Sequence, residues 1–488
     1  MIRRTVLTLI LVFTLAAAGH AAANGQSAMV KIYTVTDNPS YLNPWNSDGP
    51  ESISGSGAVI AGNRIITNAH VVSNSTFIQV RAHGSAKRYE ARVAAISHEA
   101  DLAILAVDTP AFFDGITPLE IGKLPELRQP IVVCGFPTGG DTLSMTTGVV
   151  SRIEHQIYVH SEAVLLSMQV DAAVNPGNSG GPALSDAGKI VGISMQNLPS
   201  ADNIAYLIPP PVIRQFLTDL EDGTLDGIPA LGIATQSMEN PSIRQSKQMS
   251  PDMTGSLVTR ILPKGSSDGL LQEGDVILKI DGFDVADDQT ITFRFQERTD
   301  MSYCVQRLQL GDAVDVQILR NGRRRTVRIR LTGRLGDERL VPLEYVRNPT
   351  YYIFGGIVFN PLTINFLQCW GADWQNAAPA YLLTYLDRNW RLEAGEQIVV
   401  INKVLPDSVN AGYHDTLDVV VSEVNGNPVK NLADLIDRIE NGASPFVELT
   451  LDSGSSIVLN RADCLAAGER ILKQYQVPRD RCVAGMRQ

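Results

Sequence analysis

Short apolar runs separated by turn-forming residues dominate the chain between about residue 29 and residue 206. The runs are rich in Val and Ile, and Gly, Asn, Asp and Pro lie between them; examples are residues 57–60, 64–67, 77–80, 102–105, 131–133, 148–150 and 190–193. Many short strands at fairly regular spacing, with turn residues between them, predict a β-barrel or a β-sandwich. The first part of the chain is therefore expected to be a mainly β domain.

The rest of the chain is expected to form two smaller domains, since 488 residues correspond to roughly three domains of about 150 residues. Three prolines at 209–211 begin a helical pattern, because proline is tolerated in the first turn of a helix. The β domain is therefore assigned to 29–225. Two units, 228–335 and 340–462, share a strand that ends in Asp-Gly or Asn-Gly, which is a tight-turn pattern. They are interpreted as tandem α/β modules, followed by a C-terminal tail at 463–488.

The N-terminus has the pattern of an export signal. Arg3 and Arg4 precede an apolar stretch at 6–18, and small residues follow at 19–23. This stretch is shorter than the ~20 residues needed to cross a bilayer, so residues 1–24 are predicted to be a cleaved signal peptide, with an uncleaved anchor as the alternative. The protein is then expected in the periplasm or secreted. Its net charge of -11 argues against nucleic acid as a partner and against a polybasic membrane patch.

The five cysteines give no metal-binding pattern. An odd number leaves at least one thiol unpaired within the chain, and no two are spaced as in a zinc site. Cys134 lies within an apolar run and is expected to be an inert buried thiol. The other four allow three pairings, among which Cys464 with Cys482 would fasten the C-terminal segment. No metal or cofactor is expected.

The segment 175–182, Asn-Pro-Gly-Asn-Ser-Gly-Gly-Pro, places Ser179 between glycines. Such a serine can lie on a sharply turned backbone with its hydroxyl exposed, and successive backbone N–H groups can point at a developing oxyanion. A structural Gly-Ser turn between strands is the alternative. A catalytic serine also needs a base, because the neutral hydroxyl is a weak nucleophile.

His70 is the candidate base, because it directly follows the predicted strand 64–67. Asp101 opens the predicted strand 102–105, where a buried carboxylate could orient an imidazole. Asp101 follows His70 by 31 residues, and Ser179 follows Asp101 by 78, which is the order and proportion of a two-barrel serine protease. The weighed alternatives are His98 as base and Asp108 or Asp171 as carboxylate.

Three motifs together resemble the HtrA/Deg (DegP-like) family of trypsin-like serine proteases with two C-terminal PDZ domains. They are Thr-Asn-Ala-His at 67–70, Asp-Leu-Ala-Ile-Leu at 101–105 and Gly-Asn-Ser-Gly-Gly-Pro at 177–182. The segments 293–298 and 351–359 resemble in particular the plant-type Deg branch, in which the second PDZ domain is atypical. The resemblance implies a chymotrypsin-like two-barrel fold. Ser179 would be the nucleophile, His70 the general base and acid, and Asp101 its orienting carboxylate; Gly177, Asn178 and Ser179 would form the oxyanion hole, with the amides of Gly177 and Ser179 as donors.

The resemblance also suggests how substrate is held. Ala173, six residues before the serine, would form the floor of the P1 pocket, so small or medium aliphatic residues are expected there because a basic side chain would be buried unpaired. The strand Ile193, Ser194, Met195 would pair with an extended substrate backbone. The segments 139–147, 154–165 and 196–205 resemble the regulatory loops of the family.

Peptide capture is expected at the first module, whose carboxylate-binding loop would be Leu231, Gly232 and Ile233. The stretch 355–357 could act likewise in the second module, but the aromatic-rich insertion 361–389 departs from the pattern, and its packing against another subunit is an equal alternative. The predicted protein is an exported serine endopeptidase that degrades unfolded or damaged proteins as a homo-trimer or a multiple of it. The alternatives are a PDZ-equipped holdase or sensor and a narrow processing protease.

Overall fold

The structure is a computed structural model that describes residues 25–197, 204–345 and 348–483. The predicted signal peptide at 1–24 lies outside these residues. The chain divides into two compact units. The first contains the residues up to Thr36 and Glu51–Asp337, and the second contains Asp37–Pro50 and the residues from Glu338 onward.

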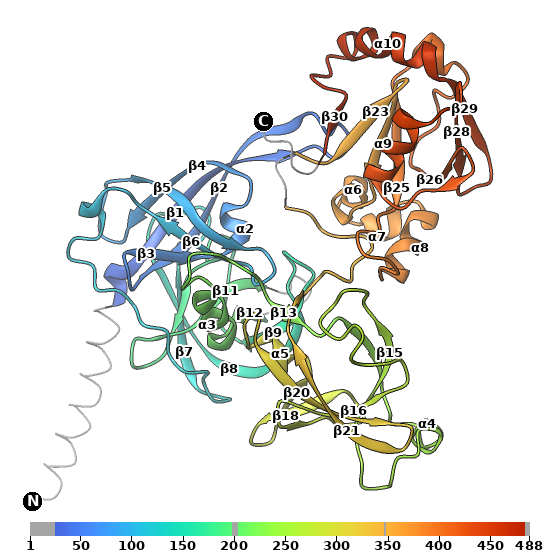
Figure 1. Ribbon diagram of the computed structural model, residues 1–488. Helices are drawn as coiled ribbons and strands as arrows, with labels where there is room; N and C mark the ends of the chain where they lie inside the picture. Colours follow the sequence, from blue (N-terminus) through green and yellow to red (C-terminus); the bar gives the residue numbers. More distant parts are fainter. Residues whose placement is uncertain (1–24, 198–203, 346–347, 484–488) are drawn as a thin grey trace, which may run out of the picture. The chain divides into compact units, whose positions relative to one another are not determined.

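Two closed six-stranded barrels form the larger part of the first unit (Figure 1). The first barrel has the strand order β1-β2-β3-β6-β5-β4 and the second has the order β10-β11-β12-β9-β8-β7. Their strands are β1 (Met29–Pro39), β2 (Ser47–Ile60), β3 (Arg64–Thr67), β4 (Ser75–Ala82), β5 (Tyr89–Ser97), β6 (Leu102–Ala106), β7 (Pro130–Gly135), β8 (Ser144–Ile157), β9 (Val164–Val170), β10 (Pro182–Leu184), β11 (Ile190–Asn197) and β12 (Ala205–Ile208). The predicted two-barrel fold is confirmed.

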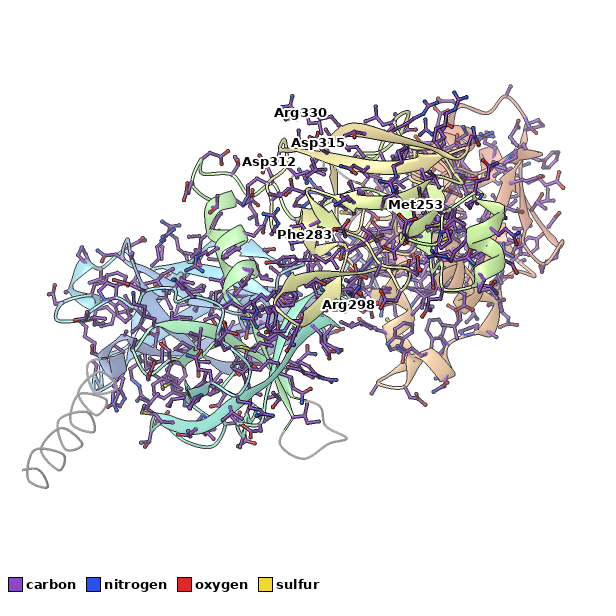
Figure 2. All side chains as sticks on the ribbon, turned by 90° about the horizontal axis from the view of Figure 1, so that it is seen from below. Met253, Phe283, Arg298, Asp312, Asp315 and Arg330 are labelled. Atoms are coloured by element: carbon purple, nitrogen blue, oxygen red, sulfur yellow. The ribbon has the colours of Figure 1, made fainter. Side chains whose placement is uncertain are left out.

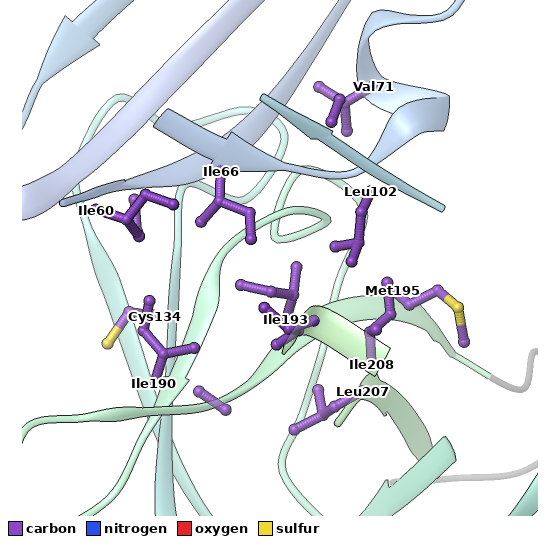
Figure 3. Close-up of a cluster of buried hydrophobic side chains, with 14 of the residues drawn as sticks. Ile60, Ile66, Val71, Leu102, Cys134, Ile190, Ile193, Met195, Leu207 and Ile208 are labelled. Atoms are coloured by element: carbon purple, nitrogen blue, oxygen red, sulfur yellow. The ribbon is translucent and has the colours of Figure 1, made fainter. Parts of the chain in front are cut away.

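One continuous hydrophobic core fills both barrels and the space between them. Figure 3 shows part of it, with side chains from the first barrel (Ile60, Ile66, Val71 and Leu102) facing side chains from the second (Cys134, Ile190, Ile193, Met195, Leu207 and Ile208). Short helical segments complete this domain: η1 (Gln26–Ala28), α2 (Ala69–Val72), η2 (Pro110–Phe112) and α3 (Pro210–Asp219). The prolines at 209–211 begin α3, as their positions in the sequence predict.

The first α/β module belongs to the same unit as the barrels. Its main sheet has the order β14-β15-β16-β20-β21, so that β14 is an edge strand, and β17 pairs with β16. Figure 2 shows side chains of this module, including Met253, Phe283 and Arg298. Its elements are β13 (Pro229–Ala230), β14 (Ile233–Gln236), α4 (Pro241–Ser246), β15 (Ser256–Ile261), β16 (Val276–Ile280), β17 (Phe283–Asp284), β18 (Thr290–Arg294), β19 (Glu297–Asp300), α5 (Tyr303–Gln306), β20 (Ala313–Arg320), β21 (Arg323–Arg330) and β22 (Gly333–Arg334).

The second module is built on the path β29-β28-β26-β25-β24-β23-β30, with β27 paired to β26. Its elements are β23 (Tyr351–Phe354), β24 (Ile357–Pro361), α6 (Ile364–Leu367), η3 (Gln368–Trp370), α7 (Trp374–Ala377), α8 (Ala380–Arg388), β25 (Val399–Val404), η4 (Ser408–Asn410), β26 (Val419–Val424), β27 (Asn427–Pro428), α9 (Leu432–Asn441), β28 (Phe446–Leu451), β29 (Ser456–Asn460), α10 (Arg461–Gln474) and β30 (Arg481–Cys482). The segment expected as a tail from 463 onward thus contains most of α10 and the strand β30, which pairs with β23.

The insertion 361–389 forms α6 to α8 and packs within its own chain. It encloses a hydrophobic cluster that includes Phe366, Trp374 and Leu382, and Tyr41 from the connection between β1 and β2 is buried in the same cluster. The amide of Asn402 donates hydrogen bonds to the carbonyl oxygens of Tyr41 and Leu42, at 3.0 and 3.2 Å. The expected alternative, a surface for another subunit, is not needed to explain these aromatic residues.

All five cysteines are free thiols. Cys464 is buried and Cys482 is half-buried, but they form no disulfide, so the suggested fastening of the C-terminal segment by this bond is wrong. Burial raises the pKa of the Cys134 thiol to about 12, in agreement with an inert core residue. Within the described ranges, no helix has the length and apolarity needed to span a membrane.

Candidate active site

His70 and Asp101 are joined in the first barrel. β3 ends at Thr67 and α2 begins at Ala69, which places His70 in the first turn of a short helix. The Asp101 carboxylate accepts a hydrogen bond from the His70 backbone N–H at 3.0 Å and lies 2.8 Å from the imidazole Nδ1. Asp101 is fully buried and has a positive φ of 52°. The turn that carries Asp101 is held by Asn68, whose side-chain amide donates to the Asp101 carbonyl at 2.9 Å.

The electrostatics of this pair favour a basic imidazole. Burial lowers the pKa of His70, but the charge and the hydrogen bond of Asp101 more than offset this, and the pKa is raised from its ordinary value. A carboxylate at Nδ1 also directs the lone pair to Nε2, the nitrogen available for proton transfer. About a third of the His70 side chain is exposed to solvent.

Ser179 lies on a tight turn in which several carbonyl groups accept hydrogen bonds. The carbonyl of Pro176 accepts from the Thr138 amide at 2.8 Å, and the carbonyl of Gly177 accepts from the Ser56 hydroxyl at 2.7 Å. Gly177 has φ +95°, and a Cβ there would lie 2.6 Å from the Phe136 carbonyl oxygen, so this position requires glycine. The Asn178 amide donates to Asn175 at 3.0 Å. The amides of Gly177 and Ser179 are therefore the ones suited to an oxyanion.

The turn that carries Ser179 packs directly against the residues that precede His70. A Cβ on Gly180 would lie 2.2 Å from the Thr67 hydroxyl and 3.1 Å from the Asn68 amide nitrogen. The Ser179 hydroxyl donates to the Met195 carbonyl at 3.4 Å, and among the described residues it makes no hydrogen bond to His70. In enzymes without substrate such catalytic contacts are often long, and rotation about χ1 can turn the hydroxyl toward the imidazole.

The predicted substrate strand lies next to the serine. On one side, Ile193 pairs with Pro182 of β10, and Ser194 is hydrogen bonded to Gly181 just before that strand. On the other side, both residues pair with β12, and the register of this pairing shifts between Ser194 and Gln196. Met195 falls in this irregularity, and its carbonyl is the one that the serine contacts. Ala173 is exposed on the loop before the turn that carries Ser179. The structure thus brings the strand and the serine together.

The weighed alternatives have other partners. His98 lies 3.0 Å from His160, measured from Nδ1 to Nε2. The Asp171 carboxylate accepts from the Val149 amide at 2.6 Å, and Asp108 is an exposed partner of Arg92. None of these contacts joins the residue to Ser179.

Two residues near the site were not found from the sequence. Ser56 is buried, and besides the Gly177 carbonyl it holds the Ser179 carbonyl through its own amide at 2.8 Å. His160 lies beside the His70 imidazole, with 6.0 Å between the ring centroids. The Gly-Ser-Gly triplet at 55–57 is a local sign that other backbone segments pack closely against Ser56. No sequence pattern distinguishes His160.

Two of the expected regulatory segments belong to the second barrel: 154–165 contains His160, beside His70, and 139–147 directly follows Thr138, whose amide donates to the Pro176 carbonyl. His155 on β8 is hydrogen bonded to the first module, with its Nδ1 2.6 Å from the Thr299 hydroxyl and its Nε2 3.0 Å from Gln306. Burial lowers the pKa of His155. The third segment, 196–205, falls partly on residues 198–203, which lie outside the described residues.

The two modules differ at the loops expected to bind a carboxylate. In the first, Gly232 has φ +66°, Leu231 is buried, and Ile233 begins the edge strand β14. In the second, β24 follows Gly355 and Gly356 and is paired on both sides, with β23 and with β25. Only the first module therefore offers a free strand edge beside its loop in the described part of the chain.

Comparison with known proteins gives matches along most of the chain. Residues 55–193 match the trypsin-like peptidase domain family, and residues 341–483 match a PDZ domain family. The chain is 41% identical to Protease Do-like 4, mitochondrial, of Arabidopsis thaliana over 93% of its own length and 84% of that protein. It is 36% identical to Protease Do-like 2, chloroplastic, of the same plant, over 93% and 74%.

Solved structures support the fold. The HtrA-type protease AlgW with decapeptide matches with a TM-score of 0.50 and 21% identity. This match covers 64% of the present chain and 98% of the other.

Proposed function

Because the chain belongs to the Do-like (Deg/HtrA) family of trypsin-like serine endopeptidases, we propose that it cleaves extended segments of unfolded or damaged proteins with Ser179 as the nucleophile. The observation that carries this proposal is the pair of buried Asp101 and half-buried His70, 2.8 Å apart, with the Ser179 turn packed against Thr67 and Asn68, which precede His70. A structural Gly-Ser turn would not need a buried carboxylate next to a half-buried imidazole.

The reaction follows from this arrangement. The Ser179 oxygen attacks the scissile carbonyl carbon while His70 Nε2 takes the hydroxyl proton, and Asp101 stabilises the imidazolium. The amides of Gly177 and Ser179 stabilise the oxyanion. The C–N bond then breaks, the amine leaves with the proton from His70, and water hydrolyses the resulting ester by the same steps.

Substrate selection is assigned to three features. An extended chain would pair with β11 near Met195, and Ala173 would admit small or medium aliphatic side chains because no charge is available there for a basic one. The free edge of β14 beside Gly232 would add a C-terminal peptide as a strand, with the backbone amides of the loop on its carboxylate.

The compartment and the assembly belong to the proposal as well. The leader pattern supports an exported protein, and the similar plant proteins are named as mitochondrial or chloroplastic. Both agree with a site of action outside the cytosol, for which the periplasm is the proposed location. A homo-trimer or a multiple of it follows from the family resemblance, and native mass measurement tests it.

Digestion of casein or reduced lysozyme tests the enzymatic proposal. The chain from residue 25 onward should degrade both substrates, and Ser179→Ala should reduce the rate by at least about 1,000-fold, as removal of a nucleophile does. The control is Ser185→Ala, at a serine in the turn between β10 and β11 of the same barrel, which should digest at the normal rate. Suppression of aggregation without cleavage by the unmodified chain would instead support a holdase.

Peptide capture is tested separately with the Ser179→Ala chain. An apolar peptide with a free C-terminal carboxylate should bind at least about tenfold more tightly than its amide, since the amide cannot receive the same charge-assisted hydrogen bonds. A photoreactive group on the peptide should label residues around β14. Labelling around β24 alone would contradict the assignment to the first module.

A further inference from the structure

Each amide assigned to the oxyanion is oriented by the carbonyl group of the residue before it. The peptide bonds of the described residues are trans, and a trans peptide is planar, with its N–H and C=O pointing in opposite directions. A hydrogen bond that holds the carbonyl therefore also fixes the direction of the amide. For the Ser179 N–H this carbonyl is that of Asn178, which accepts from the Gly181 amide at 2.9 Å. This donor is fixed within its own turn.

The Gly177 N–H depends on a separate loop. It shares its peptide plane with the Pro176 carbonyl, which accepts from the Thr138 amide at 2.8 Å. The two backbones are in close contact, because a Cβ on Gly177 would lie 2.6 Å from both the Phe136 carbonyl oxygen and the Thr138 amide nitrogen. If the loop 136–141, which follows β7, moved away, the plane could rotate and the Gly177 N–H would no longer point at the oxyanion.

The far end of this loop has no apolar side chain to bury. Residues 138–141 are exposed, and Gly139 and Gly140 have no side chain. Gly139 has φ +90°, and the Gly140 amide donates to the Pro137 carbonyl at 3.2 Å, which closes a tight turn. The position of this turn must then be fixed by polar contacts with other elements.

Lys31 on β1 holds the loop from the first barrel. Its side chain is only 7% exposed, and its Nζ donates to the Gly140 carbonyl at 2.6 Å and to the Asp141 carboxylate at 2.7 Å. The Tyr33 hydroxyl donates to the same carboxylate at 3.3 Å, and Arg81 on β4 donates to the Asp141 carbonyl at 3.0 Å. Lys31 makes the two shortest of these contacts. The loop that supports one oxyanion donor is thereby fixed to the opposite barrel.

Stability alone is a poor explanation of this buried lysine. Removing an ammonium group from water costs free energy, and replacing a buried ion pair by apolar side chains is often neutral or stabilising. An apolar side chain at position 31 would, however, leave the Gly140 carbonyl and the Asp141 carboxylate without this partner. The lysine therefore contributes the position of the loop more than the stability of the barrel.

We propose that Lys31 and Asp141 are positioning residues for the proteolytic reaction: their ion pair holds the loop 136–141 against the Ser179 turn, so that the Gly177 N–H stays directed at the oxyanion. Both residues act through the backbone of the loop and take no part in the proton transfer. This inference rests on the proposed function, in which two backbone amides stabilise the oxyanion.

The test compares catalysis with stability in Lys31→Met, which keeps the length of the side chain but carries no charge. Loss of an oxyanion donor lowers kcat by about 100- to 1,000-fold, so a donor that is misdirected part of the time should lower it about tenfold. KM on the same fluorogenic peptide should stay within about twofold, because the contact is made only in the transition state. A peptide boronate, whose tetrahedral adduct with Ser179 places an oxygen at the oxyanion position, should bind about tenfold more weakly. The temperature of thermal unfolding should be unchanged or higher.

Hydrogen exchange provides a readout that does not depend on activity. The Thr138 amide should exchange about tenfold faster in Lys31→Met, because its bond to Pro176 opens more often. The Gly181 amide, which holds the other donor, should exchange at the rate of the unmodified chain. This difference separates loosening of the loop from loosening of the whole barrel.

Matched variants show whether the ion pair is responsible. Lys31→Arg keeps the cation and should retain kcat within about threefold. Asp141→Asn should lower kcat as Lys31→Met does, and K31M/D141N should be no slower than the slower single variant, because both remove the same contact. The control is Lys189→Met, which removes an exposed ion pair with Glu120, 2.8 Å long, just before β11, and should leave kcat unchanged.

The proposal is overturned if Lys31→Met keeps the kcat of the unmodified chain, if boronate binding is unchanged when kcat falls, or if Thr138 exchange is unaffected. A loss of kcat that accompanies an equal loss of thermal stability also overturns it, since that is the result of a merely structural role. Asp141→Asn, at an exposed side chain, provides the comparison if Lys31→Met does not fold. Only activity that Ser179→Ala abolishes is analysed, and residual cleavage in Ser179→Ala would refute the proposed function instead.

Discussion

The two α/β modules begin a central strand with the same residue but surround it differently. Asp275 precedes β16 in the first module and Asp418 precedes β26 in the second. Asp275 is buried and receives two hydrogen bonds from the Arg320 guanidinium, at 2.7 and 2.6 Å. Burial raises the pKa of Asp418 to about 6, and the charge of Lys403 opposes this shift without cancelling it.

The two modules also differ in whether the strand after the loop has an unpaired edge. The first module leaves β14 open beside Gly232, whereas the second covers β24 with its own strand β23, to which β30 is added in turn. Tyr352 on β23 belongs to the core of the second module, and its hydroxyl donates to Glu440 at 3.3 Å. One repeat pattern can therefore encode a module with an open strand edge beside its loop and a module in which the corresponding strand is paired on both sides.

The largest expected difference between the two modules is the effect on stability of replacing Asp275 or Asp418. Asp275→Asn leaves the Arg320 charge partly buried without its partner and should destabilise the first module by about 3 kcal/mol. Asp418→Asn at pH 7 removes a poorly solvated charge and should leave the second module as stable or more stable. Hydrogen exchange of β16 and β26 measures each effect locally. Equal losses at both sites would remove the proposed distinction.

A smaller contrast is expected between the loop glycines. A Cβ on Gly356 would lie 2.4 Å from the Asn410 amide and 2.5 Å from the Leu405 carbonyl, whereas one on Gly232 would have its nearest neighbour at 3.3 Å. Both have positive φ, so Gly356→Ala should cost about 3 kcal/mol and Gly232→Ala about 1 kcal/mol.

Tryptophan fluorescence during urea unfolding measures the Gly356 effect. All four tryptophans (Trp45, Trp370, Trp374 and Trp390) lie in the second unit. The Gly232 effect should leave this signal unchanged and be visible by hydrogen exchange in β14 and β15. A matching loss in both variants would show that the second loop is as open as the first.

The smallest effect is the pH dependence of the second module. An acid whose pKa is raised on folding binds its proton more tightly in the folded state, so its contribution is complete below the unfolded value of about 3.9 and is lost as pH rises through about 6. Stability of the second unit, followed by tryptophan fluorescence, should therefore decline across this window. Asp418→Asn should abolish that decline. If the variant keeps the same slope, another group is responsible.

The sequence was informative where the pattern is local. The short strands predicted a β-barrel or a β-sandwich, and the order of His70, Asp101 and Ser179 together with the family resemblance predicted two barrels, which the fold confirms. The structure pairs His70 with Asp101 and packs the Ser179 turn against Thr67 and Asn68. It was uninformative where contacts join distant segments with no periodic pattern. Ser56, His160 and the burial of Tyr41 in the second unit are of this kind. The proposed pairing of Cys464 with Cys482 failed for the same reason, since sequence proximity does not fix the separation of two side chains.

The burial of Tyr41 has a consequence for biosynthesis. The segment Asp37–Pro50 is made early, but the side chains that enclose Tyr41, such as Leu362 and Phe366, follow about 320 residues later. During translation the Tyr41 side chain can be buried only after the C-terminal third of the polypeptide has left the ribosome. Folding of the second unit is therefore completed only when synthesis is nearly finished. A prematurely terminated product would leave the Tyr41 side chain exposed to chaperones and proteases.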